Sequence, residues 1–137
     1  MYLTKLTPSE RNVFTKLAYE LINCDSMVDD GETNHMKNCA LEMGIRFHEL
    51  DTSMSFKDAL CEAKHLSPKT KRIILTELMI VAFSDCYLAE IERKLLCEIE
   101  DALQTDNETS SYCEKIAKEY NRINTTIDKF IERGFLK

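Results

Sequence analysis

The chain repeats its own pattern at an interval of 60 residues. When the sequence is shifted by that interval, its only two prolines, Pro8 and Pro68, fall on one another. The residues that follow also coincide by type: Val13 with Ile73, Phe14 with Ile74, Asp25 with Asp85, Val28 with Leu88, Glu32 with Glu92, Met36 with Leu96, Cys39 with Ile99 and Met43 with Leu103. Self-similarity at a fixed interval indicates a duplicated structural unit. We therefore expect two copies of one unit, at residues 7–43 and 67–103.

Each unit has the pattern of a helical hairpin. Thr7-Pro8-Ser9-Glu10 fits a helix start, in which Thr7 caps, Pro8 suits the first helical position and Glu10 completes a capping box. Ser67-Pro68 opens the second unit in the same manner. Apolar residues then recur at helical spacing, first at Val13, Phe14, Leu17, Ala18, Leu21 and Ile22, then at Met36, Cys39, Ala40 and Met43 before Gly44.

The rest of the chain also has helical periodicity. A shorter helix is expected around Phe56–Ala63, and the stretch 73–83 is apolar almost all round, as in a helix enclosed by its neighbours. The later apolar positions are Ile91, Leu95, Ile99, Ala102 and Leu103, then Cys113, Ile116, Ala117, Tyr120, Ile123, Ile127, Phe130 and Ile131. With only three glycines and two prolines in 137 residues, the chain is too poor in turn residues for a β-rich fold. These patterns predict one all-α domain over residues 1–137, a compact bundle of about six to seven helices with a long final helix at 107–133.

Composition narrows the classes of partner. A formal net charge of −6 argues against nucleic-acid binding, which depends on neutralising phosphates. The basic run Lys69, Lys71 and Arg72 is read as a solvated helix start. The apolar stretch 73–83 is far shorter than the ~20 residues that cross a bilayer, and the N-terminus lacks a signal-peptide pattern. We expect a cytoplasmic protein without membrane insertion, whose six cysteines stay reduced.

The two hairpin loops share the motif Asp-x-x-(Val/Leu)-x-x-x-Glu. It reads Asp25-Ser-Met-Val-Asp-Asp-Gly-Glu32 in the first unit and Asp85-Cys-Tyr-Leu-Ala-Glu-Ile-Glu92 in the second. Here the chain resembles the TerB-like family of tellurite-resistance domains, which are all-helical and contain repeated hairpins. The family has glycine where this chain has Ser26 and Cys86. The resemblance implies a link to stress response and a divalent-cation site with Asp25, Glu32, Asp85 and Glu92 as oxygen ligands, suited to Ca²⁺ or Mg²⁺.

A structural role is the alternative interpretation of these four acidic residues. Glu32 follows Asp29 by three residues, as in a capping box. Asp25 and Asp85 could instead bond the amides of their own loops. Each motif offers few ligands for a tight site, so the sequence favours capping over metal binding.

Two further kinds of site have weaker patterns. His35 and Cys39, and likewise Cys61 and His65, are spaced four apart, so each pair could face one zinc ion from a helix. Without any Cys-x-x-Cys, zinc is disfavoured. For catalysis, the chain contains neither a glycine-rich phosphate loop nor an HExxH motif. Glu77, in the apolar stretch 73–83, is expected to reach the surface or to pair with a base such as Arg72 or Lys94.

These patterns lead to three functional hypotheses. The first is a non-enzymatic, TerB-like helical module that binds a partner protein, with the long last helix or the acidic loops as its contact surface. The alternative is a divalent-metal-binding or metal-sensing domain that uses the four acidic residues. An enzyme of unknown reaction comes last, because no group of residues forms a catalytic signature.

Overall fold

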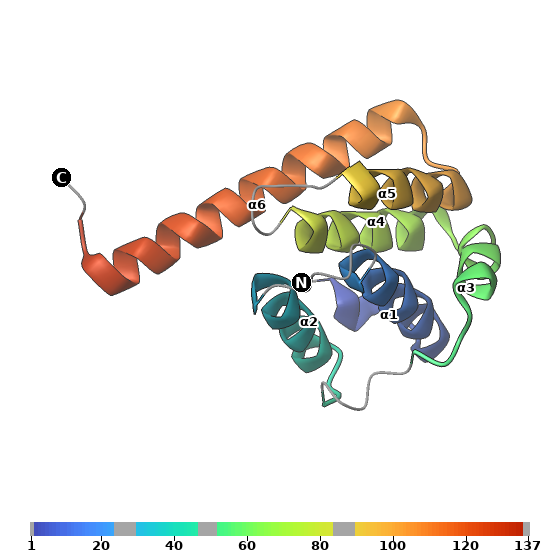
Figure 1. Ribbon diagram of the computed structural model, residues 1–137, viewed down its shortest axis with the longest axis horizontal. Helices are drawn as coiled ribbons and strands as arrows, with labels where there is room; N and C mark the ends of the chain where they lie inside the picture. Colours follow the sequence, from blue (N-terminus) through green and yellow to red (C-terminus); the bar gives the residue numbers. More distant parts are fainter. Residues whose placement is uncertain (1, 24–29, 47–51, 84–89, 136–137) are drawn as a thin grey trace.

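The described part of the chain contains six α-helices and one short 3-10 helix (Figure 1). The computed structural model describes residues 2–23, 30–46, 52–83 and 90–135. The elements in chain order are η1 (Leu3–Lys5), α1 (Pro8–Asn23), α2 (Asp30–Glu42), α3 (Phe56–Ala63), α4 (Pro68–Ala82), α5 (Glu90–Leu103) and α6 (Asn107–Arg133). The prediction of an all-α bundle of six to seven helices is confirmed.

Local capping explains where the helices begin. The amide of Glu10 donates to Thr7 Oγ1 at 3.3 Å, and the amide of Thr7 donates to Glu10 Oε1 at 2.8 Å, which is the expected capping box. Ser67 accepts from the amide of Thr70 at the start of α4. Asp106 accepts from the amide of Thr109 at the start of α6. Each cap satisfies an amide that has no partner within its own helix.

Helix α4 lies at the centre of the bundle. It packs against α1, α2, α5, α6 and η1, while α3 packs against α1 and α5. Burial extends around most of its circumference, at Thr70, Ile74, Leu75, Glu77, Leu78, Met79, Ile80, Val81 and Ala82. The expectation of an enclosed fourth helix is confirmed. Because η1 and all the described α-helices named above as its neighbours pack against α4, this helix positions both candidate surfaces described below.

The two predicted units correspond in their details. The first helix of each, α1 and α4, begins at its proline, and the second, α2 and α5, ends at a residue with positive φ: Gly44 at 76° and Gln104 at 56°. Both ends have the same backbone bond, from Ile45 to the carbonyl of Ala40 and from Thr105 to that of Glu100. The loops at 24–29 and 84–89 lie outside the described residues. The duplication therefore stays a prediction, with these matching helix ends in its favour.

The predicted buried faces of α5 and α6 need correction. Helix α5 buries Ile99, Ala102 and Leu103 as expected, but in its first turns it buries Glu92 and Leu96, while Ile91 is 49% exposed and Leu95 is only partly buried. Helix α6 buries only Ser110, Cys113, Ala117 and Asn121. Its apolar residues from Ile123 onward are exposed, because the C-terminal half of α6 extends past the other helices (Figure 1).

Candidate functional site

The four acidic motif residues are only partly within the described structure. Asp25 and Asp85 lie outside the described residues, and Glu32 lies in the first turns of α2. Glu92 is buried in the first turn of α5, where the helix dipole favours a carboxylate. The cation hypothesis stays a prediction. Its test is calorimetry with Ca²⁺ and Mg²⁺, in which binding heat should disappear in an Asp25→Asn, Asp85→Asn double variant.

The structure describes the two candidate zinc pairs, His35 with Cys39 and Cys61 with His65, to different extents. Cys39 is buried in α2, and burial, with the nearby Glu77 carboxylate, raises the pKa of its thiol to about 12. The side chain of His35 lies outside the described residues, so the pairing of His35 with Cys39 stays a prediction. Cys61 lies in α3, but His65 lies beyond the end of that helix at Ala63, so the expected pairing of Cys61 and His65 on one helix is wrong. Nowhere in the described ranges do three or more His, Cys, Asp or Glu side chains gather as metal ligands would.

Four of the six cysteines fall in the described ranges, and all four are free thiols. Cys39 and Cys113 are buried in the core, as expected from their place in apolar stripes, while Cys61 and Cys97 are exposed. Among the described helices, none combines the length and the apolar character needed to span a bilayer.

A hollow between η1, α4 and α6 is the first candidate binding surface. It has a volume of about 460 Å³ and is bounded by Tyr2 and Lys5 from η1 and its approach, by Lys69 to Ile80 of α4, and by Ile116 of α6. Its lining is mostly apolar and includes Ile73, Ile80 and Ile116. A second hollow of about 610 Å³ adjoins it and shares Arg72, Thr76 and Ile116. We call the first one the basic hollow.

The charge of the basic hollow differs from that of the whole chain. Three cationic residues line it, Lys5, Lys69 and Arg72, against one carboxylate, Glu77. Glu77 is buried and accepts a hydrogen bond of 3.0 Å from the amide of Tyr2. Its carboxylate therefore holds Tyr2 against α4 and does not reach the surface, while the alternative expectation, pairing with a base, stays a prediction. The basic hollow thus combines an apolar lining with a cationic rim in a chain of net charge −6.

The second candidate surface is an apolar stripe along α6. We define the α6 stripe as Ile116, Tyr120, Ile123, Ile127 and Phe130. Ile123, Ile127 and Phe130 are each about half exposed, at 49%, 47% and 52%. Single exposed apolar residues are ordinary, whereas several gathered on one helix face indicate an interaction site.

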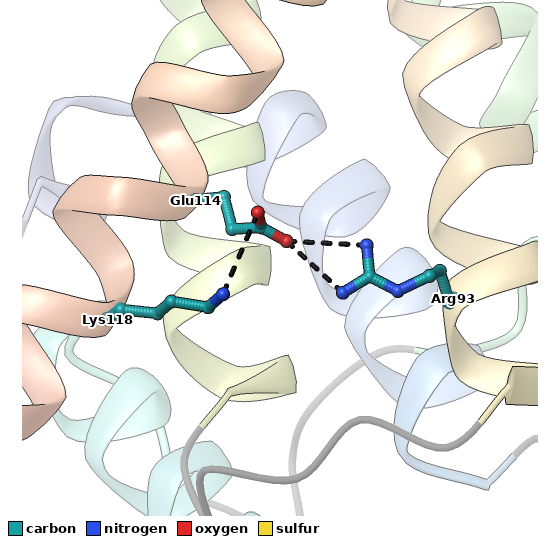
Figure 2. A network of polar contacts seen from close by, with 3 residues as sticks. All are labelled: Arg93, Glu114 and Lys118. Atoms are coloured by element: carbon teal, nitrogen blue, oxygen red, sulfur yellow. Dashed lines mark hydrogen bonds and ion pairs between the residues drawn. The ribbon is translucent and has the colours of Figure 1, made fainter.

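A polar network holds the first half of α6 in place. Glu114 of α6 accepts from both terminal guanidinium nitrogens of Arg93 in α5 at 3.4 Å, and Lys118 lies 3.8 Å from its other oxygen (Figure 2). Lys118 also lies over the ring of Phe83, with its Nζ 5.0 Å from the centroid. Exposed ion pairs of this kind are worth only about 0–1 kcal/mol each. The network therefore orients α6 more than it stabilises the fold.

Neither candidate surface could be predicted completely from the sequence. Lys69 and Arg72 are exposed at the start of α4, as the interpretation of a solvated helix start expects, and they also line the basic hollow. Their partners come from residues 2–5 and from Ile116, which are distant in sequence, so no local pattern could join them. The apolar spacing of the α6 stripe was visible in the sequence, but a helix that faces the core has the same spacing, so the exposure of the stripe could not be predicted from it.

Comparisons with known proteins neither support nor oppose the TerB-like resemblance, since no family model, curated protein or solved structure matches the chain.

Proposed function

We propose that the chain is a non-enzymatic helical module that binds an acidic amphipathic helix of a partner protein in the basic hollow. The observation that carries the proposal is the charge contrast between this hollow and the rest of the molecule. Lys5, Lys69 and Arg72 line an apolar depression on an otherwise acidic chain. An amphipathic helix docked in a groove buries its apolar side chains there and places its charged residues at the rim.

The chemistry of the hollow defines the partner. Apolar anchors of the partner would lie against Ile73, Ile80 and Ile116, and its carboxylates would face Lys69 and Arg72. Opposite charges at a rim speed association and exclude basic partners, and these effects weaken as salt is added. A place for such a module in stress response, and membership of a TerB-like group, belong to the same proposal and rest on the two acidic motifs.

Synthetic peptides test this function. One peptide carries leucines at helical spacing with glutamates on either side, a second replaces the glutamates by lysines, and a third scrambles the acidic sequence. We expect fluorescence anisotropy to show binding of the acidic helix alone, with affinity falling as salt rises from about 50 to 200 mM, because screening weakens rim charges.

Matched variants locate the binding site. Arg72→Glu should weaken binding at least about tenfold, since it turns an attraction into a repulsion in a partly desolvated rim. Lys94→Glu changes the charge of the chain equally, but on an exposed residue of α5, and should leave the affinity unchanged. Equal binding of the acidic, basic and scrambled peptides, or equal losses in the two variants, would contradict the proposal.

A further inference from the structure

The α6 stripe has the spacing of a coiled-coil seam. Ile116, Tyr120, Ile123, Ile127 and Phe130 follow one another at intervals of four, three, four and three residues. This alternation averages 3.5 residues and is the repeat that keeps one face of a helix turned toward a partner helix. In this numbering Tyr120 and Ile127 occupy heptad position a, and the other three occupy position d.

The buried face of α6 lies beside the stripe, and of the stripe residues Tyr120 packs partly against the core and Ile116 lines the basic hollow. The residues that α6 buries are Ser110, Cys113, Ala117 and Asn121, which form their own helical row beside the stripe. Beyond Asn121 none of the described α6 residues is buried. The arm of α6 that leaves the bundle (Figure 1) therefore carries most of the stripe into open space.

We propose that a second copy of this chain covers the stripe, with the two α6 arms packed antiparallel around a two-fold axis. In the register centred near residue 125, Tyr120 lies opposite Phe130 of the second copy and Ile123 lies opposite Ile127 of the second copy. A two-fold interface uses the same patch on both copies, so one self-complementary stripe is sufficient. Ile116, which also lines the basic hollow, lies outside the stretch 120–130 that this register pairs, so the interface does not need the hollow or its partner.

The flanking charges select this arrangement. In an antiparallel pair, residues at heptad position g face one another, and the g positions here are Glu119, Thr126 and Arg133. The same register places Glu119 opposite Arg133 of the second copy, and the two-fold axis creates that pair twice. Glu119 and Arg133 are both exposed. A parallel pair would place Glu119 against Asn124 and would gain no opposite-charge contact.

The area available is sufficient for a specific dimer. The half-exposed stripe residues together with Ile131, which is 72% exposed, would bury on the order of 1,000 Å² over both copies, near the lower limit of specific interfaces. A dimer that dissociates in the micromolar range fits this size better than an obligate one.

Sedimentation velocity over a concentration series tests the pairing. We expect a reversible monomer–dimer equilibrium in the intact chain and a monomer for Ile127→Asp, because a buried carboxylate would lie in the seam. Leu41→Asp, which alters an apolar residue of α2 that is 74% exposed, should dimerise normally. Circular dichroism checks that each variant stays helical.

Charge reversal tests the register. Glu119→Arg and Arg133→Glu should each weaken the dimer about tenfold, because two attractions become two repulsions. An equimolar mixture of these two variants should form heterodimers with the original affinity, since every pair is then opposite in sign. A chain that stays monomeric at millimolar concentration, or a dimer unchanged by Ile127→Asp, overturns the proposal. Loss of peptide binding in the basic hollow without loss of the dimer would count only against the proposed function.

Discussion

Buried polar side chains in this protein hold the ends of helices. Helix α4 ends at Ala82, so the carbonyl of Ile80 lies in its last turn, where carbonyls commonly take a partner from outside the helix. Asn121 of α6 is buried and donates to that carbonyl at 3.0 Å through Nδ2. One amide thus satisfies the end of the central helix and attaches α6 to it.

Loss of this amide should destabilise the fold. Asn121→Ala would leave the buried carbonyl of Ile80 without its donor, which costs about 1–3 kcal/mol of unfolding free energy. Urea unfolding followed by circular dichroism measures the change. The matched control is Asn38→Ala on the exposed side of α2, where the effect should stay within about 0.5 kcal/mol. An equal loss in both variants would show that the contact with Ile80 contributes nothing.

At the scale of the elements, the ends of helices carry the most specific local chemistry. Helices α2 and α5 both end at a residue with positive φ, and only the first of these is a glycine. A side chain at positive φ approaches its own backbone closely, so the conformation is costly for Gln104 and easy for Gly44. The two ends have the same backbone bonds and differ in this strain.

Reciprocal substitutions at the two ends should have opposite effects. Gln104→Gly should raise the unfolding free energy by about 0.5–1 kcal/mol, and Gly44→Ala should lower it by about 1 kcal/mol. A Cβ at Gly44 would meet no atom within 4 Å, so the loss there reports backbone strain alone. Thermal and urea unfolding of the two variants measure both changes. Changes of the same sign would contradict this account.

Asp106, which caps the start of α6, should make the unfolding free energy depend on pH. Hydrogen bonds from the backbone and side chain of Thr109 lower the pKa of Asp106 below its usual value of 3.8. Because the folded chain holds the charged form, this contribution is present above the unfolded pKa and disappears as pH falls through the folded one. Asp106→Asn keeps a capping oxygen but does not titrate. The stability difference between the two proteins should therefore shrink as pH falls from about 5 to about 2, as measured by urea unfolding at each pH.

At the scale of the whole molecule, the two predicted units share a core. Helix α1 of the first unit packs against α5 of the second, and α2 packs against α4. Glu10 of α1 also accepts from Thr70 of α4 at 3.1 Å, a bond between residues that the 60-residue shift makes equivalent. Neither unit has a separate interior in this arrangement.

Unfolding should consequently be a single transition. Helicity and tyrosine fluorescence should change together in urea, because loss of either unit exposes the core of the other. Leu78→Ala at the fully buried centre of α4 should lower the unfolding free energy by about 2–5 kcal/mol without separating the two signals. Two separate transitions would contradict both this prediction and the single domain expected from the sequence.

The sequence alone determined where the helices lie. The capping box at Thr7 and Glu10, the prolines at helix starts and the spacing of apolar residues in α1 and α4 act within a few residues, so they are visible along the chain. For the same reason the final helix was predicted at residues 107–133, where α6 is found.

Only the tertiary structure decided which faces those helices cover. The sequence has apolar residues along the whole of α6, but α4 covers only the row at Cys113 and Ala117 and leaves Ile123 onward exposed. The basic hollow likewise needs Tyr2, Arg72 and Ile116 in one place. Periodicity shows that a face is apolar, whereas its burial depends on the lengths and crossing of helices that are distant in sequence.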